Sequence, residues 1–229
     1  MPMTPTVAEG TAGTARHPAP MALYEDADLL VLNKLSGLLC VPGRGPDKQD
    51  CLSARAQLHW PGALIVHRLD QATSGLVLMA RHADAQRRLS LAFEQRQVHK
   101  RYLAVVQGLV AEPPGIWADI HLPIAADWER RPLRIIDALQ GKPSHTRWRT
   151  LAHNTAAGTT RVELEPVTGR THQLRVHLAA LGHPILGDAL YADAATQAQA
   201  PRLLLHAGEL ALTHPATGQA MRWDLAADF

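Results

Sequence analysis

The sequence predicts a mixed α+β fold built around a mostly antiparallel sheet. Short apolar segments of strand length recur along the chain, separated by glycine, proline and threonine, whereas few segments show helical periodicity. Residues 161–165 alternate polar and apolar side chains with a period of two, which is typical of a strand with one buried face. These observations favour antiparallel pairing over a parallel sheet that is buried on both faces.

The expected strands are short apolar runs bounded by turn-forming residues, and they cover residues 29–32, 63–66, 76–79, 102–106, 161–165, 203–205, 210–212 and 221–223. Two helices are expected. Residues 82–96 place Leu89 and Phe93 on one side among charged residues. A second helix has Thr171 as its N-cap, carries leucines at helical spacing and ends at Gly182.

Composition places the chain among ordinary globular proteins. Its 229 residues allow a substantial core, with 46% hydrophobic and 19% charged residues. No apolar stretch approaches the roughly 18 residues of a membrane span, and no secretory signal is visible, so we expect a cytoplasmic protein. Cys40 and Cys51 lack metal-site spacing, which predicts reduced thiols. Residues 1–20 are rich in Thr, Ala, Pro and Gly, and we expect a flexible tail there.

Charge alone does not establish a nucleic-acid partner, because the formal net charge is only +2. Its distribution is more informative. Residues 81–101 hold six Lys or Arg against two acids, and residues 127–149 hold six against three. Such runs are usually solvated faces, but they are also candidate tracks for a phosphate backbone.

The segment with the clearest chemistry is His-Arg-Leu-Asp-Gln-Ala-Thr-Ser-Gly, residues 67–75, a polar loop between two apolar runs. It places the ionisable Asp70 beside an arginine. Taken alone, the loop could be an ordinary hairpin whose aspartate caps a turn and pairs with that arginine. Ser74 lacks the G-x-S-x-G context of a hydrolase nucleophile, and residues 41–46 lack the Gly-Lys-Ser/Thr ending of a P-loop.

Five ordered segments together carry a family resemblance. They are residues 67–75, 100–108, 168–177, 182–188 and 202–207, and the similarity extends over nearly everything from Leu23 to Phe229. The chain resembles the pseudouridine synthases of the RluA family, and most closely its short dual-specificity branch. One departure is Lys34-Leu35, where relatives commonly have Lys-Pro.

The resemblance implies a sheet split into two lobes with a catalytic cleft between them and flanking helices. We therefore expect residues 21–229 to form one pseudouridine synthase catalytic domain, without a separate N-terminal RNA-binding domain. The expected substrate is structured RNA, with one target uridine in a tRNA anticodon stem-loop and one in a 23S rRNA hairpin loop. A synthase restricted to one of these RNAs and a non-catalytic RNA-binding protein are the alternatives. No cofactor, metal, DNA, membrane or obligate protein partner is expected.

The family's catalytic residues match Asp70, Tyr102 and Arg175 in this sequence. Asp70 would be the carboxylate that acts at the sugar as nucleophile or base. Arg175 would keep it ionised, and Tyr102 would pack on the target base and serve in the later proton transfer. From spacing alone, Arg175 could equally be a surface arginine and Tyr102 a core strand residue.

A target base inside a folded RNA has to be extruded from its stack. By resemblance, Arg68 is the residue that enters the vacated space, because a guanidinium can stack on bases and bind phosphates. An ion pair with Asp70 or another acid is the alternative for Arg68. Five more residues are expected in the RNA-binding part of the site, and two of them, His67 and Thr73, shape the loop around Asp70. The five are His67, Thr73, Arg170, His172 and Gln173.

Two other site chemistries find little support. The thirteen histidines include no H-E-x-x-H motif or Cys/His cluster, and His172 and His177 are spaced five apart, which does not bring them together on one helix face. A glycoside hydrolase would need a second catalytic carboxylate at a defined separation from the first.

Overall fold

A computed structural model describes residues 20–111 and 114–229. The tail expected at residues 1–20 lies outside the described residues, except for Pro20. None of the described helices is long and apolar enough to cross a membrane.

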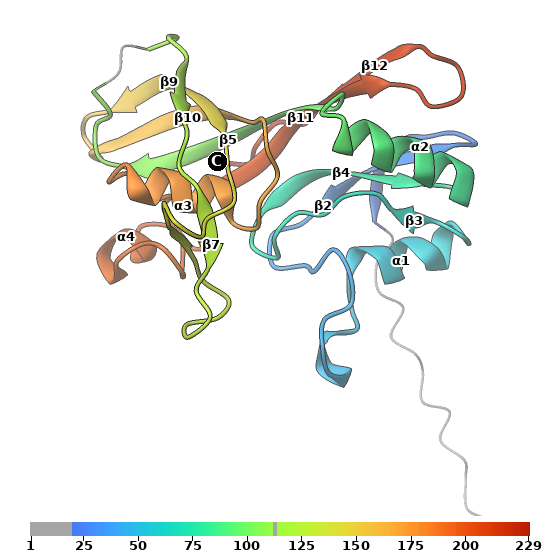
Figure 1. The fold of residues 1–229 in the computed structure, drawn as a ribbon, viewed down its shortest axis with the longest axis horizontal. Coiled ribbons are helices and arrows are strands. Elements are labelled where there is room, and N and C mark those ends of the chain that lie inside the picture. The colour runs from blue at the N-terminus through green and yellow to red at the C-terminus, as the bar shows by residue number, and fades with distance from the viewer. Residues whose placement is uncertain (1–19, 112–113) are drawn as a thin grey trace, which may run out of the picture.

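One ten-stranded sheet organises the molecule (Figure 1). Its order is β1-β2-β4-β11-β5-β10-β9-β6, with β3 paired to β4 and β12 to β11. Every pairing in the described sheet is antiparallel except that of β4 with β11. The strands are β1 Met21–Glu25, β2 Leu29–Lys34, β3 Leu64–Ile65, β4 Ser74–Ala80, β5 His99–Gln107, β6 Ala118–Ile120, β9 Thr146–Asn154, β10 Thr159–Pro166, β11 Leu205–Thr213 and β12 Ala220–Asp224.

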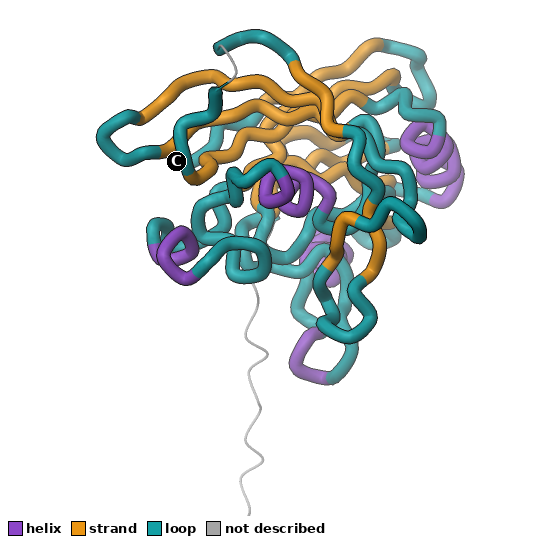
Figure 2. The backbone as a smooth tube through the Cα atoms, turned by 60° about the vertical axis from the view of Figure 1, so that its left-hand side comes forward, coloured by secondary structure: helices purple, strands orange, loops and turns teal. Residues whose placement is uncertain are grey.

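Four α-helices and a separate two-stranded ribbon complete the described fold, together with a 3₁₀ turn at Pro46–Lys48. The helices are α1 Leu52–His59, α2 Ala83–Glu94, α3 Gln173–Ala180 and α4 Ala194–Ala198, and the ribbon pairs β7 Ile124–Ala126 with β8 Arg134–Ile136. Figure 2 shows this ribbon set apart from the large sheet. The expectation of a mixed, mostly antiparallel fold is confirmed.

Three apolar clusters divide the sheet into two lobes. In the first lobe, α2 packs on one face of β2 and β4, and α1 packs on the other, so that both strands are buried on both sides. In the second lobe, Leu174 and Leu178 of α3 pack on the apolar face of β5, β9 and β10. The parallel pairing of β4 with β11 joins the two lobes in the middle of the sheet.

Several expected elements are confirmed as parts of longer ones, and others are wrong. The helix expected at residues 82–96 is α2, which is shorter at both ends and has His82 as its N-cap, whose imidazole accepts the Ala85 N–H. Leu205 and residues 210–212 belong to one strand, β11, because Gly208 makes an irregularity rather than a turn, whereas residues 203 and 204 precede the strand. Only Leu64–Ile65 of residues 63–66 pair with β4, so the Asp70 loop is longer than a tight hairpin.

The backbone at position 75 explains why the Asp70 loop, residues 67–75, ends in a glycine. Gly75 lies where β4 meets β11, with φ +116, and a Cβ at this position would come within 2.3 Å of the Ala207 carbonyl oxygen. A glycine is therefore required for the two lobes to approach closely enough to pair.

Lys34 anchors the loop from the other side. Its side chain is fully buried, and its ammonium donates to the carbonyls of Leu35, Leu38 and Gln71 at 2.7–2.9 Å. Burial lowers its pKa to about 8. The ammonium thus ties the segment after β2 to the residue that follows Asp70, while Leu35, at the family's usual proline position, is exposed.

Lys34→Met should lower the free energy of unfolding by about 3 kcal/mol. Loss of three part-buried hydrogen bonds from a charged donor costs about 3–9 kcal/mol, and relief of charge burial returns about 3 kcal/mol. Urea unfolding at pH 7 measures the difference, with Lys48→Met, at an exposed lysine, as the control. Equal stability of the two variants would contradict the anchoring role.

Candidate active site

All nine residues that the sequence analysis assigns to the site line one cavity of about 320 Å³ between the lobes. They come from the β3–β4 loop, β5 and the segment that enters α3, and they are Asp70, Tyr102, Arg175, Arg68, His67, Thr73, Arg170, His172 and Gln173. A second hollow of about 950 Å³ opens on the other side of Asp70 and shares Arg68, His172 and Arg175 with the first. Asp70 therefore lies where the two hollows meet.

The Asp70 carboxylate faces two nitrogen groups of the opposite lobe. Its Oδ2 atom lies 3.8 Å from Nη1 of Arg175 and 4.0 Å from Nε2 of His172. The side chain keeps 24% of its surface exposed, so a ligand can reach it. Its backbone carbonyl accepts the Thr73 N–H, which closes the loop around it.

A buried aspartate fixes Arg175 in place. Asp188, which is fully buried, accepts Nε and Nη2 of Arg175 at 2.8 and 2.6 Å. Burial opposes the charge of Arg175, but the hydrogen bonds to Asp188 and the carboxylates of Asp188 and Asp70 raise its pKa above the ordinary value. The bidentate pair occupies two guanidinium nitrogens and leaves Nη1 directed at Asp70.

His172 is oriented by Tyr191. The Tyr191 hydroxyl accepts the backbone N–H of Arg134 and lies 2.7 Å from Nδ1 of His172. Because the Tyr191 oxygen already accepts one hydrogen bond, we assign its hydroxyl as the donor to Nδ1 of His172. The proton of the neutral ring then lies on Nε2, and this N–H faces Asp70. Burial lowers the pKa of His172, so the neutral ring is favoured. Asp70 therefore faces one cation and one neutral donor.

Tyr102 both packs in the interior and lines the cavity. It contacts the apolar clusters of both lobes, so the alternative of a packing residue describes its ring correctly. Its hydroxyl has no hydrogen-bond partner among the described residues. Burial, and then the charges of Asp70 and Cys40, raise its pKa, so the phenol keeps its proton at neutral pH.

His67 and Thr73 shape the loop. Nε2 of His67 accepts the Leu78 N–H at 2.9 Å, and its ring stacks on Phe93 with centroids 4.6 Å apart. Burial, with a smaller effect of Lys100, lowers the pKa of His67 to about 3, so the ring is neutral. Thr73 is buried and closes the turn after Asp70.

The segment before α3 differs from the expected helix start. Thr171 is not the N-cap, because the preceding position of α3 is His172, which has φ +57 and makes no side-chain cap. Instead, Oε1 of Gln173 accepts the Arg170 N–H and the Thr168 hydroxyl, while its Nε2 donates to the His145 carbonyl and the Thr146 hydroxyl. The buried amide of Gln173 has all its bonds within the protein, so it holds this loop in shape.

The two arginines expected to meet RNA are exposed. Arg68 forms no ion pair or hydrogen bond with any of the described residues, so its pairing with Asp70 is absent from this part of the chain. Arg170 makes one 3.3 Å bond to the Pro143 carbonyl. Both guanidinium groups are therefore available to an anionic ligand.

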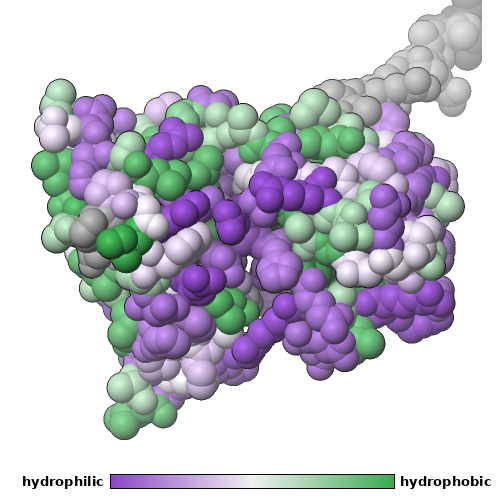
Figure 3. Space-filling model, turned by 90° about the horizontal axis from the view of Figure 1, so that it is seen from above, coloured by the Kyte–Doolittle hydropathy of each residue, from purple (hydrophilic) through white to green (hydrophobic). Residues whose placement is uncertain are grey.

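Most cations of the two basic runs are paired within the described protein. On the face of the sheet away from α3, Arg149 and Arg101 contact Glu163, and Arg147 contacts Glu165. Three of these guanidinium groups also surround Trp117 at 4.7–5.7 Å from its ring. Hydrophilic side chains gather across the middle of the molecular face drawn in Figure 3. For these residues, the interpretation as a solvated face is the better one.

Several residues that sequence reasoning missed hold the side chains of the cavity in position through hydrogen bonds. Asp188 belongs to a recognised segment, but nothing in the sequence shows that it pairs with Arg175. Tyr191 comes from the loop after α3, Arg134 begins β8, and Lys34 ends β2. Their shared signal is a polar side chain next to an apolar run, which is too common to identify a partner.

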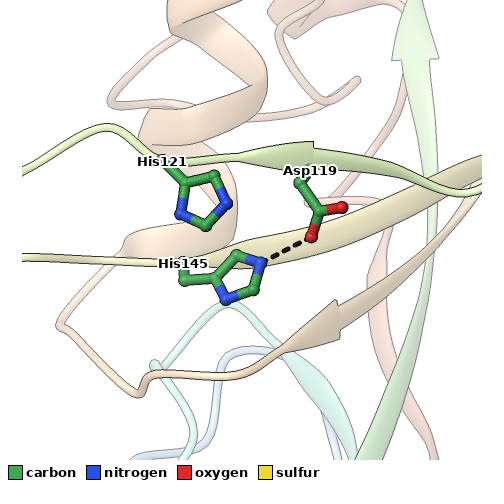
Figure 4. A group of neighbouring side chains, drawn as sticks. All are labelled: Asp119, His121 and His145. Atoms are coloured by element: carbon green, nitrogen blue, oxygen red, sulfur yellow. Dashed lines mark hydrogen bonds and ion pairs between the residues drawn. The ribbon is translucent and has the colours of Figure 1, made fainter.

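A group of potential metal ligands lies outside the cavity (Figure 4). Asp119, His121 and His145 gather at the pairing of β6 with β9, and Asp119 accepts Nε2 of His145 at 2.6 Å. The two imidazoles stack with centroids 4.1 Å apart and an interplanar angle of 21°, so their lone pairs lie in two nearly parallel planes, which is unsuited to binding one metal ion. A second group, Asp26, Asp28 and His214, is held together by hydrogen bonds among its own members, from the Asp28 N–H to Oδ1 of Asp26 and between Nε2 of His214 and Oδ2 of Asp26. Neither group contributes to the cavity.

Comparison with known proteins places the chain among RNA pseudouridylate synthases. Residues 28–180 match the family model described as RNA pseudouridylate synthase. The dual-specificity RNA pseudouridine synthase RluA of Escherichia coli is 45% identical over 93% of this chain and 96% of that protein. The Haemophilus influenzae protein of the same name is 43% identical over 90% and 93%. The structure of human RNA pseudouridylate synthase domain containing 1 has a TM-score of 0.76 and 30% identity, covering 99% of this chain and 87% of that chain.

The half-buried His67 predicts a loss of stability in acid. The unfolded chain takes up a proton on this ring below its ordinary pKa of 6.5, whereas the folded ring resists until about pH 3, so stability falls as pH falls through that window. Between pH 7 and 5 the wild type should lose about 2 kcal/mol more than His67→Gln, which keeps an acceptor for the Leu78 N–H. Urea unfolding at both pH values tests this, with His99→Gln as the exposed control. A wild type no more acid-sensitive than His67→Gln would contradict it.

Proposed function

This chain belongs to the RNA pseudouridylate synthase family, and from that premise we propose that it isomerises one uridine in a tRNA anticodon stem-loop and one in a 23S rRNA hairpin loop. The proposal of two substrates is supported by the dual-specificity relatives, which match over nearly their full length. As a pseudouridine synthase it is an isomerase: the bond from N1 to C1′ breaks, a bond from C5 to C1′ forms, and a proton leaves C5 while N1 gains one. We further propose that it works in the cytoplasm, without a cofactor or an obligate protein partner.

The observation that carries the assignment of Asp70 is its position. Among the described residues it is the one carboxylate on the walls of both hollows, and a fixed guanidinium lies 3.8 Å from it. A nearby cation in a partly closed site favours the charged carboxylate. These observations support the proposal that Asp70 acts at the ribose as nucleophile or base. A hydrolase that uses two carboxylates would lack its second group here.

Tyr102 is proposed to pack on the uracil ring and to take part in proton transfer. Because its raised pKa keeps the phenol protonated, it would accept the C5 proton only while passing its own proton on. Asp70 is the carboxylate in the same cavity that could receive it. Arg175 remains an electrostatic partner, since Asp188 holds its position.

Arg68 is proposed to enter the space that the flipped uridine leaves in the RNA. It is exposed at the border of both hollows and is two residues from Asp70. Its planar guanidinium is suited to stacking on bases, and no described acid competes for it. A non-catalytic RNA-binding protein would have no need to keep Asp70, Tyr102 and Arg175 together, which makes that alternative the weaker one.

Asp70→Asn should abolish pseudouridine formation while leaving the fold and RNA affinity close to those of the wild type, because the change is nearly isosteric and removes only the charge. Both RNAs are incubated with enzyme and pseudouridine is mapped by nucleotide position. Asp224→Asn, on the outer strand β12, is the control and should keep full activity. Turnover by freshly purified Asp70→Asn, free of deamidation, would disprove the role of Asp70. Wild-type activity on only one RNA would restrict the proposal to that substrate.

Arg68→Ala should impair a structured stem-loop far more than a version whose target uridine is already unstacked. Arg68→Lys should rescue poorly, because an ammonium cannot stack as a plane. Single-turnover rates on the two RNAs make the comparison. If both RNAs lose rate equally, Arg68 acts on Asp70 electrostatically and not by filling the gap.

A further inference from the structure

Lys100 is a cation of the catalytic cavity to which the proposed function gives no task. Four Lys or Arg side chains line this cavity among the described residues, and they are Arg68, Lys100, Arg170 and Arg175. Arg175 is held by Asp188, and Arg170 bonds to a carbonyl outside the cavity wall. Arg68 is proposed to enter the RNA stack. The position of the remaining cation, Lys100, therefore calls for an explanation.

The strand β5 places Lys100 beside Tyr102. Side chains two residues apart on a strand point to the same face of the sheet, about 6.6 Å from each other along the strand. The intervening Arg101 points to the opposite face, where it contacts two glutamates. The face that carries Lys100 and Tyr102 continues into the apolar cluster on which α3 packs. A uracil ring packed on Tyr102 would therefore have the Lys100 side chain next to it.

The ammonium of Lys100 has no anion beside it in the described part of the chain. It makes no hydrogen bond or ion pair with any described residue, and its Nζ atom lies 5.7 Å from the centre of the Phe93 ring. The same ring stacks on His67, which is neutral. Burial lowers the pKa of Lys100, because a charge is less stable away from water. A cation–π contact offsets only part of that cost, so a negative charge in the cavity would be attracted to this ammonium.

The isomerisation itself generates a negative charge on the base. When the N1–C1′ bond breaks, its electron pair stays on the uracil ring, and the charge is shared by N1 and the two carbonyl oxygens. Asp70 acts on the other fragment, either by bonding to C1′ or by removing a ribose proton. Nη1 of Arg175 is directed at Asp70, so this guanidinium serves the carboxylate. A fixed ammonium beside the detached ring would stabilise the anion where its charge develops.

We propose that Lys100 is a further catalytic residue, whose ammonium donates to a carbonyl oxygen of the uracil ring and stabilises the anion that forms when the N1–C1′ bond breaks. Lys100 keeps its own proton throughout. The electron pair of the anion then forms the bond from C5 to C1′, after which C5 loses a proton and N1 gains one. This rests on the proposed function, because it requires a uridine packed on Tyr102.

A contact with an RNA phosphate is the other task that a cation in this cavity could have. It is less favoured for Lys100, because this side chain is half-buried on the face of Tyr102, whereas Arg68 and Arg170 are exposed. The exposed arginines are accessible to a phosphate backbone outside the cavity. Lys100 is instead placed for the part of the substrate that goes inside.

The first test separates chemistry from binding on a tRNA anticodon stem-loop. Lys100→Met should lower the single-turnover rate at saturating enzyme by about 10²- to 10³-fold, the loss typical of removing one donor to a developing negative charge. RNA affinity, measured in an Asp70→Asn background, should stay within about twofold of its parent. Lys100→Arg keeps the charge and should recover part of the rate. Arg101→Gln is the matched control, because it removes a cation from the opposite face of the same strand, and it should react like the wild type.

The second test changes the stability of the anion. Fluorine at C5 withdraws electrons from the ring, so a 5-fluorouracil anion needs less stabilisation by Lys100 than a uracil anion does. With 5-fluorouridine at the target position, the rate loss caused by Lys100→Met should therefore be markedly smaller than with uridine. For both RNAs the rate is taken from the disappearance of the target nucleoside after nuclease digestion, because a C5 that carries fluorine has no proton to lose. A merely structural role of Lys100 would slow both substrates by the same factor.

Equal losses on uridine and 5-fluorouridine, or a wild-type rate in Lys100→Met, would overturn the proposal. An equal loss in Arg101→Gln would overturn it too, because the effect would not depend on the face of the strand. Weaker binding with an unchanged rate at saturation, and a slope of log K against log salt reduced by about 0.7–0.9, would make Lys100 a phosphate contact instead. Failure of the proposed function is distinct, because the wild type itself would then form no pseudouridine on either RNA.

Discussion

The buried pair between Arg175 and Asp188 is the interaction on which the rest of the site depends. A buried ion pair is weak evidence for stability, because taking both charges out of water offsets much of their attraction. Its effect here is to fix the direction in which the guanidinium of Arg175 points. Asp188 occupies two nitrogens of the guanidinium and also accepts two backbone N–H groups of its own loop, so Nη1 can only face Asp70. The cation is therefore held beside Asp70 by the protein alone, and a charge fixed in this way needs no reorganisation when a ligand binds.

Periodicity and local motifs predicted the elements that depend on local sequence. The helix α2 and the strands around Leu76, Tyr102 and Val162 follow their patterns, and every expected site residue lines one cavity. What failed depends on distant partners. Gly208 was expected to lie in a turn, but it forms an irregularity within β11. Thr171 was expected to be an N-cap, but His172 occupies that position, and the side chain of Gln173 bonds to the preceding loop. The supporting roles of Asp188, Tyr191 and Lys34 arise only when separate segments meet, which one sequence does not reveal.

The arginines of this protein fall into two groups that sequence cannot distinguish. Those on the outer face of the sheet have glutamates on the neighbouring strand and form a cross-strand ladder. Those around the cleft, such as Arg68 and Arg134, lack a described acid. A net charge of +2 therefore understates the attraction that a polyanion would meet at the cleft. Pairing, not abundance, decides where cations remain free.

The place of β11 in the sheet governs the order in which the protein can be completed. This strand lies between β4 and β5, yet it is made more than a hundred residues after β4. Until residues 205–213 leave the ribosome, the two lobes are half-sheets with open edges, and Leu205 has not closed the wall of the cavity. Such a long-range pairing is slow to form and exposes strand edges in the meantime. A nascent chain therefore carries the Asp70 loop early but has no assembled pocket around it until β11 has paired with both lobes.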